Sequence, residues 1–256
     1  MKKLFLAAMV FILGACSTSE KQVSEIIKKN PQIVFDVIEQ NPEQFVDVVN
    51  KAARKAQEDR QKKQLAEMKK QEDDQSKNPL KPLLPENRLL SGSKDGSIVI
   101  VEYADFQCPA CRMAYDNLKP VKEKYKDKIK FYYKNMPLDF HKMAYPSALY
   151  FEAIAKQDMA KAKKYYDYLF EHQEQLHNEN FLKESAKKLG VDMKRLAADV
   201  KSEDVKKVVE NDMKEFENFG FTGTPVIVVN GIALYGAQPT EEIERVIGLT
   251  TKEKAN

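Results

Sequence analysis

Apolar residues in the second half of the chain fall into short β-rich runs separated by longer helical patterns. Residues 97–104 (SIVIVEYA) form a continuous, mostly β-branched run, which is typical of a strand buried on both faces. A helical pattern follows and leads into a second β-rich run at residues 128–134. Two further runs flank Asn230-Gly231, a dipeptide that favours a tight hairpin turn. The pattern therefore predicts a βαβ unit and, later in the chain, a β-hairpin of the same sheet.

Residues 139–218, between these two parts, have a predominantly helical pattern. Apolar residues recur at helical spacing in five segments, namely 144–154, 160–170, 180–189, 193–200 and 205–219. A short amphipathic helix is expected at residues 241–247. The five segments predict a helical insert whose tyrosines and phenylalanines lie in a core.

The N-terminal third contains an imperfect repeat. Asn30-Pro31 and the apolar positions after it recur eleven residues later, from Asn41-Pro42. Each Asn suits a helix N-cap, with Pro at the first helical position. Because such short amphipathic helices are unstable alone, they need a partner, either the main domain or other copies of themselves. We expect self-association through residues 20–76, with packing on the chain's own domain as the alternative.

Residues 51–77 are almost wholly charged, Gln or Ala, with nine Lys or Arg and six Asp or Glu. High helix propensity without an apolar face predicts a solvated helix or a flexible tether. Prolines at 79, 82 and 85 end this segment. We therefore assign residues 16–84 to a helical, charged arm and linker, and residues 85–250 to the folded domain, with the insert at about 139–218.

The composition excludes several classes of protein. The 256 residues include 42 Lys and Arg against 39 Asp and Glu, a net charge of +3. This near balance argues against a nucleic-acid partner, since nucleic-acid affinity depends on neutralising phosphates. Three cysteines are too few for a disulfide-stapled scaffold.

Residues 1–15 have the pattern of a secretory signal. Lys2 and Lys3 precede an apolar run at 4–13, which is too short to span a bilayer. The order Leu13-Gly14-Ala15-Cys16 resembles the bacterial lipobox, in which the cysteine carries acyl chains and becomes the new N-terminus. This resemblance implies lipidation of Cys16 and attachment to a membrane, whereas an ordinary cleaved signal is the alternative.

The chemistry of the chain is predicted at Cys108-Pro109-Ala110-Cys111, between the first strand and the helix after it. Cys108 is expected at the helix N-terminus, where free amides and the helix dipole favour a thiolate and lower its pKa. Cys111 lies one turn further on, close enough to form a disulfide. We therefore expect Cys108 to be the attacking nucleophile and Cys111 to resolve mixed disulfides.

Other uses of this cysteine pair are less consistent with the sequence. Arg112 stands where a haem-attachment motif needs His, and the three histidines do not have zinc-finger spacing, so no metal site is expected. A structural disulfide closing four residues would gain little from loop-closure entropy. It remains an alternative for an exported chain.

Glu102 interrupts the apolar strand six residues before Cys108. A carboxylate in a buried strand is unfavourable unless it is paired or used, and burial raises its pKa. We expect it to relay a proton for Cys111. The alternative is a Glu that faces solvent or pairs with Lys134.

Together these features resemble the DsbA-like branch of the thioredoxin superfamily, exported thiol–disulfide oxidoreductases, over about residues 85–248. The resemblance rests on the CxxC sequence, on Gly223-Thr224-Pro225 before the third strand and on the hairpin. It implies an α/β thioredoxin fold with an inserted helical domain, preceded here by an extended helical N-terminal arm. It further implies that Cys108, Cys111 and Glu102 are catalytic and that Thr224 and Pro225 form a substrate-binding cis-proline loop. Pro109 and Ala110 are assigned to substrate contact as well, but they lack the His found there in strongly oxidising members.

The sequence thus predicts a membrane-anchored, envelope-facing oxidoreductase whose only redox group is its own disulfide, with no bound cofactor. Its expected partners are unfolded or cysteine-containing envelope proteins and a membrane redox protein, either a quinone-linked oxidase or a thiol reductase. The arm also resembles the oligomerising arms of some DsbA-like isomerases, including copper-tolerance-associated ones. An alternative function is a Cu(I)-binding or chaperone-like envelope protein that uses the two thiolates as soft ligands.

Overall fold

The computed structural model describes residues 19–252. The predicted lipidation site Cys16 and the signal segment 1–15 therefore lie outside the described residues. The chain forms two compact units, residues 1–66 and 67–256. The predicted division near residue 84 stays a prediction. None of the helices in residues 19–252 is both long and apolar enough to cross a bilayer.

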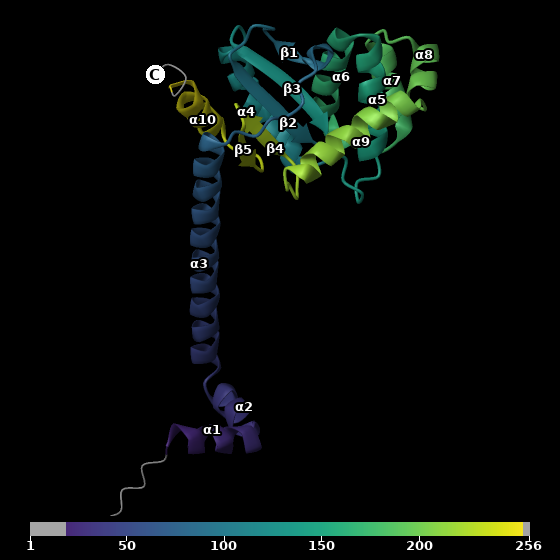
Figure 1. The fold of residues 1–256 in the computed structure, drawn as a ribbon. Helices are drawn as coiled ribbons and strands as arrows, with labels where there is room; N and C mark the ends of the chain where they lie inside the picture. Colours follow the sequence, from purple (N-terminus) through teal and green to yellow (C-terminus); the bar gives the residue numbers. More distant parts are fainter. Residues whose placement is uncertain (1–18, 253–256) are drawn as a thin grey trace, which may run out of the picture. The chain divides into compact units, whose positions relative to one another are not determined.

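The first unit is helical and contains α1 (Glu20–Lys29), α2 (Gln32–Gln40) and the start of α3 (Pro42–Lys77), as labelled in Figure 1. Residues 51–77 are thus helix and not a flexible tether. The predicted helix start is confirmed in position for Asn41-Pro42, since α3 begins at Pro42, but it is wrong for Asn30-Pro31, since α2 begins at Gln32. The side-chain amides of Asn30 and Asn41 both donate backwards, to the carbonyls of Ile26 and Val37, at 3.2 and 2.9 Å. Each Asn closes the helix before it, since an amide donor can satisfy a free C-terminal carbonyl.

The described side chains of the first unit leave their apolar positions in solvent. None of the residues in α1, α2 or α3 is buried. The large apolar side chains exposed on these helices are Val23, Ile26, Ile27, Ile33, Val34, Phe35, Val37, Phe45, Val46, Val48, Val49, Leu65 and Met68.

The second unit is built on a five-stranded mixed sheet in the order β1-β3-β2-β4-β5. Its strands are β1 (Ser91–Gly92), β2 (Ile98–Ala104), β3 (Ile129–Asn135), β4 (Val226–Val229) and β5 (Ile232–Tyr235). The parallel pair β2–β3 is joined by α4 (Pro109–Lys124), and β4 runs antiparallel to both β2 and β5. The predicted βαβ unit and hairpin are confirmed, and β1 is an additional edge strand.

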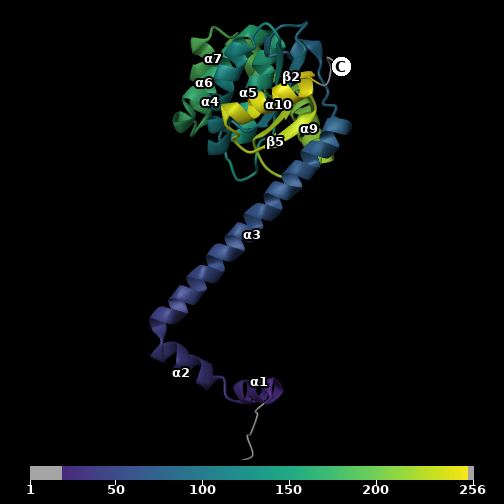
Figure 2. The same ribbon diagram turned by 90° about the vertical axis from the view of Figure 1, so that its left-hand side faces the viewer.

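The predicted helical insert is confirmed between β3 and β4. It consists of α5 (Ala144–Gln157), α6 (Met159–Glu171), α7 (Glu179–Lys188), α8 (Met193–Asp199) and α9 (Glu203–Asn218), with a 3₁₀ turn at Gln173–Gln175. These helices form a group beside the sheet (Figure 1). After the hairpin comes α10 (Thr240–Lys252), which is longer than the predicted helix. In Figure 2, turned by 90° from Figure 1, it is the yellow helix.

Two apolar clusters cover the two faces of the sheet, as the continuous run in β2 predicted. Ile100 and Ala104 join α4, α5, α6 and α10 in the larger cluster, whereas Val101 and Tyr103 pack with Phe216 and Phe221 in the smaller one. The segment 78–90 borders the smaller cluster. Leu80 donates its backbone N–H to the Gly231 carbonyl at 2.9 Å.

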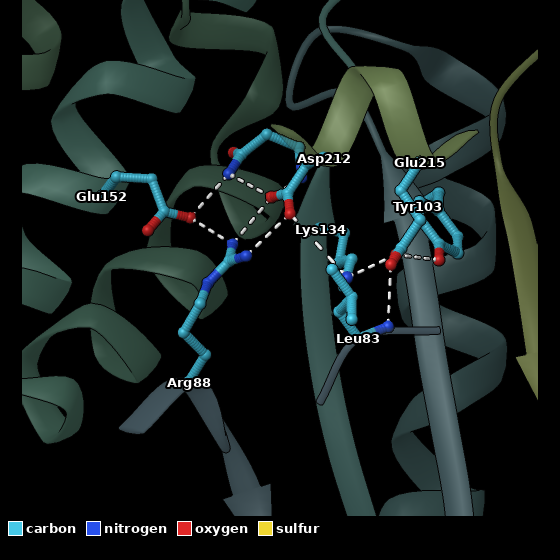
Figure 3. Close-up of polar contacts among 8 residues, drawn as sticks. Leu83, Arg88, Tyr103, Lys134, Glu152, Asp212 and Glu215 are labelled. Atoms are coloured by element: carbon cyan, nitrogen blue, oxygen red, sulfur yellow. Dashed lines mark hydrogen bonds and ion pairs between the residues drawn. The ribbon is translucent and has the colours of Figure 1, made fainter. Parts of the chain in front are cut away.

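A buried polar network fixes the end of this segment (Figure 3). Arg88, in a 3₁₀ turn at Glu86–Arg88, donates to both carboxylate oxygens of Asp212 at 2.7 Å and to Glu152 at 2.6 Å. Glu215 accepts from the Leu83 backbone and from the Tyr103 hydroxyl, and it also contacts Lys134. The network therefore joins residues 83–88 to β2, β3, α5 and α9.

Candidate active site

Cys108 begins α4 at the point where the chain leaves β2. It is the N-cap residue, with extended φ and ψ of −74° and 121°, and Pro109 occupies the first helical turn. The Cys108 carbonyl accepts the backbone N–H groups of Cys111 and Arg112 at 3.0 and 3.1 Å. Both cysteines are free thiols in the structure. The strand–turn–helix order therefore places both sulfurs at the amino end of one helix.

The two thiols differ in burial and in acidity. Cys108 is 7% exposed and Cys111 is fully buried. The pKa of Cys108 is lowered to about 5, chiefly by a hydrogen bond from the Cys111 thiol. Burial opposes this shift, whereas the Thr224 side chain and the backbone amides of Cys111 and Ala110 add to it. Burial and the neighbouring Cys108 raise the pKa of Cys111 well above its usual value.

The Thr224–Pro225 peptide, which is cis, lies against the Cys108 sulfur. The Cys108 thiol is 3.7 Å from the Thr224 carbonyl oxygen. Pro225 directly precedes β4, which pairs antiparallel with β2. The fold thus brings residues from positions 108–111 and 224–225 together, as the resemblance implied.

Glu102 is fully buried in the middle of β2. Its Oε2 accepts a hydrogen bond from the Tyr166 hydroxyl at 2.6 Å, and its Oε1 has no hydrogen-bond partner among the described residues. Burial raises its pKa to about 7, against the opposing effects of Tyr166 and Lys122. Both alternatives for this residue are wrong, because it neither faces solvent nor pairs with Lys134, whose partner is Glu215.

Side chains from the insert hold the turn before Cys108. Gln173 donates its side-chain amide to the carbonyls of Phe106 and Cys108 at 2.8 and 3.0 Å. His141 Nδ1 lies 2.7 Å from a carboxylate oxygen of buried Asp105, which is hydrogen-bonded to the Leu138 backbone as well. Sequence reasoning missed these contacts, since their partners lie more than thirty positions away and carry no local signal.

Within residues 19–252, three or more His, Cys, Asp or Glu side chains do not gather in a way that could hold a metal ion.

Comparison with known proteins places these features in context. A family model described as thioredoxin matches residues 85–248. The chain is 32% identical over 151 residues to the "Probable disulfide bond formation protein D" of Bacillus cereus, covering 55% of this chain and 68% of that protein. It is also 29% identical over 171 residues to "Na(+)/H(+) antiporter NhaA 1" of Mycolicibacterium vanbaalenii, but it spans only 27% of that protein's length.

Solved structures agree with the fold. BdbD from Bacillus subtilis has a TM-score of 0.61 at 24% identity, covering 68% of this chain and 97% of that one. A linker-deletion variant of ScsC from Proteus mirabilis has a TM-score of 0.57 at 16% identity and covers 93% of this chain and 99% of that one. The expected thioredoxin fold and the resemblance to DsbA-like proteins are confirmed.

Proposed function

Because the chain belongs to the thioredoxin family, we propose that it is a thiol–disulfide oxidoreductase that forms, isomerises or reduces disulfides in other proteins through Cys108 and Cys111. The observation that carries this proposal is the opposite behaviour of two adjacent thiols. One has its pKa lowered to about 5, and the other has its pKa raised well above the usual value. At neutral pH the pair therefore supplies one ready nucleophile and one thiol that reacts only after it loses a proton.

In the reductive direction, the Cys108 thiolate attacks a substrate disulfide. A mixed disulfide forms and one substrate thiolate leaves. Glu102 then accepts the Cys111 proton, and the Cys111 thiolate attacks the Cys108 sulfur. The second substrate thiolate leaves and Cys108–Cys111 becomes a disulfide, so that two electrons pass to the substrate.

In the oxidative direction the same steps run in reverse, and two electrons pass from a substrate dithiol to the Cys108–Cys111 disulfide. A low pKa makes Cys108 a good leaving group, which favours donation of the disulfide. Thr224 and Pro225 form the wall beside the sulfur, and we assign them, with Pro109 and Ala110, to contact with the substrate chain.

Turnover of a scrambled-disulfide protein tests this proposal. We expect Cys108→Ser to abolish turnover and Cys111→Ser to accumulate a mixed disulfide with the substrate, seen as a mass increase on a non-reducing gel. Full activity in Cys108→Ser would refute the mechanism. Titration of the reduced protein with Cu(I) separates the rival function, since a copper carrier would bind the metal tightly and fail to turn over the substrate.

For the place of action, we propose the bacterial envelope, with acyl chains on Cys16 as the anchor. Its support is the lipobox-like order Leu13-Gly14-Ala15-Cys16 after a short apolar run. Several acyl chains make membrane attachment stable. We expect Cys16→Ala to move the protein from the membrane fraction to the soluble one, and unchanged fractionation would count against the anchor. A membrane redox protein would then set whether the pair is kept oxidised or reduced.

The assembly we propose is a homo-oligomer through residues 20–76. Its support is the set of apolar side chains that α1, α2 and the start of α3 expose to solvent. Phe35, for example, is 56% exposed and Val48 is 64% exposed. Burying such surface in a second copy gains about 25 cal/mol per Å². Light scattering tests this: Phe35→Lys with Val48→Lys should lower the molar mass. Leu83→Lys, an exposed apolar position outside the first unit, should not.

A further inference from the structure

Lys122 on α4 is held among three aromatic rings. Its Nζ lies 4.5 Å from the centre of the Phe131 ring, 4.9 Å from that of Tyr166 and 5.2 Å from that of Tyr115. These rings come from β3, α6 and α4. Rings at this range attract a cation through their negative faces, and more strongly where water is excluded. The arrangement therefore fixes the position of one ammonium group inside the domain.

This ammonium group differs from its charged neighbours. Lys119 pairs with Glu171 at 2.8 Å, and Lys163 pairs with Asp167 at 3.0 Å. Within the described part of the chain, Lys122 has no carboxylate within 4.0 Å. Its charge is therefore not neutralised by a direct partner, and it can act on more distant buried groups.

The buried group on which the Lys122 charge acts is Glu102. The Tyr166 ring that lies over Lys122 carries the hydroxyl that donates to Glu102 Oε2 at 2.6 Å. The positive charge of Lys122 opposes the effect of burial on Glu102, and the negative charge of Glu102 does the same for Lys122. In a poorly polarisable interior, such charges interact strongly over several ångströms.

The other side of Lys122 faces a cavity of about 530 Å³. Tyr115, Lys119, Lys163 and Asp167 share its wall, and Lys126 and Glu123 on the rim are exposed. Burial lowers the pKa of Lys122, whereas the negative charges of Glu102 and Asp167 act against this shift. Access to water through the cavity also favours the charged form. Lys122 thus lies between the solvent in this cavity and the Glu102 carboxyl group, which is the proposed proton acceptor.

We propose that Lys122 is a positioning residue for thiol exchange: held by the three rings, its positive charge sets the pH range over which Glu102 is a carboxylate able to accept the Cys111 proton. This inference rests on the proposed function. The other titratable groups that face the pair are Tyr133 on β3 and Tyr166 on α6 for Glu102, and Asp167, Lys163 and Lys119 for Lys122.

The test measures the resolving step alone. A mixed disulfide between Cys108 and nitrothiobenzoate is prepared, and the release of the coloured thiolate by Cys111 is followed as a function of pH. Without the Lys122 charge, Glu102 holds its proton to higher pH. We therefore expect Lys122→Met to move the acid limb of the rate profile up by about one pH unit.

Two matched variants control for structural effects. Lys122→Arg keeps the positive charge and should restore the wild-type profile. Lys119→Met removes a lysine one turn earlier, from the same cavity and the same Tyr115 ring, and should leave the limb in place. Equal shifts in Lys122→Met and Lys119→Met, or no shift in Lys122→Met, would overturn the inference.

Glu102→Gln separates this inference from the function on which it rests. If the acid limb persists in Glu102→Gln, the carboxyl is not the proton acceptor and the proposed function fails at that step. If Glu102→Gln removes the limb while Lys122→Met leaves it unmoved in the wild-type background, only the role of Lys122 is refuted.

Discussion

The Cys108 sulfur is the most accessible reactive atom of the candidate site, and its hydrogen-bond donors decide its chemistry. With a pKa near 5, the Cys108 thiol is largely thiolate at neutral pH, whereas burial keeps the Cys111 thiol protonated. We expect alkylation of Cys108 by iodoacetamide to be half-maximal near pH 5, as the thiolate is the reacting form. Cys111 should stay unmodified up to pH 9. Peptide mass spectrometry after acid quenching measures both sites, and a Cys108 midpoint near 9 would contradict the site geometry.

Burial of Glu102 lowers the free energy of unfolding by an amount that depends on pH. Its pKa is raised from 4.5 to about 7, so the folded protein binds this proton more tightly than the unfolded chain does. Stability is therefore lost as pH rises from about 4.5 through about 7. We expect Glu102→Gln to raise the free energy of unfolding by about 3 kcal/mol at pH 8 and to change little at pH 4. Urea unfolding at the two pH values measures this.

A matched control comes from Glu184→Gln, since Glu184 is exposed on α7 of the insert. It should leave stability unchanged at both pH values. An equal gain from Glu102→Gln at pH 4 and pH 8 would show that packing, not charge, explains the effect.

At the scale of elements, the polar network around Arg88 anchors residues 83–88, the segment that leads into the sheet, to α5 and α9. Figure 3 shows its guanidinium between Asp212 on α9 and Glu152 on α5. All three side chains are largely removed from solvent. Leaving two buried carboxylates without a cation is strongly destabilising. We expect Arg88→Met to cost about 3–5 kcal/mol in urea unfolding.

The control for this prediction is Arg195→Met. The Arg195 side chain is half-exposed and lies 3.4 Å from Asp199. Exposed pairs contribute up to about 1 kcal/mol, so the loss should stay below that value. If both variants lost a similar free energy of unfolding, the buried network would contribute no more to stability than an exposed ion pair.

Much of this fold follows from local patterns in the sequence. The β-branched run at 97–104 predicts β2, and the β-rich run at 128–134 predicts β3. Asn230-Gly231 predicts the β4–β5 turn, and Cys108-Pro109 predicts the start of α4. Two-residue β1 has too few positions to show a period. The Arg88 network and the Gln173 contacts join residues more than 60 positions apart, so only the folded chain reveals them. Burial of Glu102 was predictable from its strand, but the Tyr166 and Lys122 around it were not.

At the scale of the whole molecule, the exposed apolar positions and the reactive thiols belong to different units. Among the described residues, the two free thiols lie in the second unit, and most of the exposed large apolar side chains lie in the first unit. Chemistry and assembly should therefore be separable by substitution. Oxidation of a small dithiol needs only one cysteine pair, whereas isomerising a misfolded protein benefits from several binding sites held together, because linked sites raise the local concentration of the substrate.

The double variant Phe35→Lys with Val48→Lys tests this separation. We expect it to oxidise a short dithiol peptide at the wild-type rate, since neither side chain is buried in the structure. Isomerisation of a scrambled-disulfide protein should fall at least several-fold, because an effective-concentration gain of 10²–10⁴ can be lost with the assembly. Leu83→Lys should leave both activities intact. Equal losses of both activities in the double variant would mean that the arm supports the fold of the catalytic unit and has no separate role in assembly.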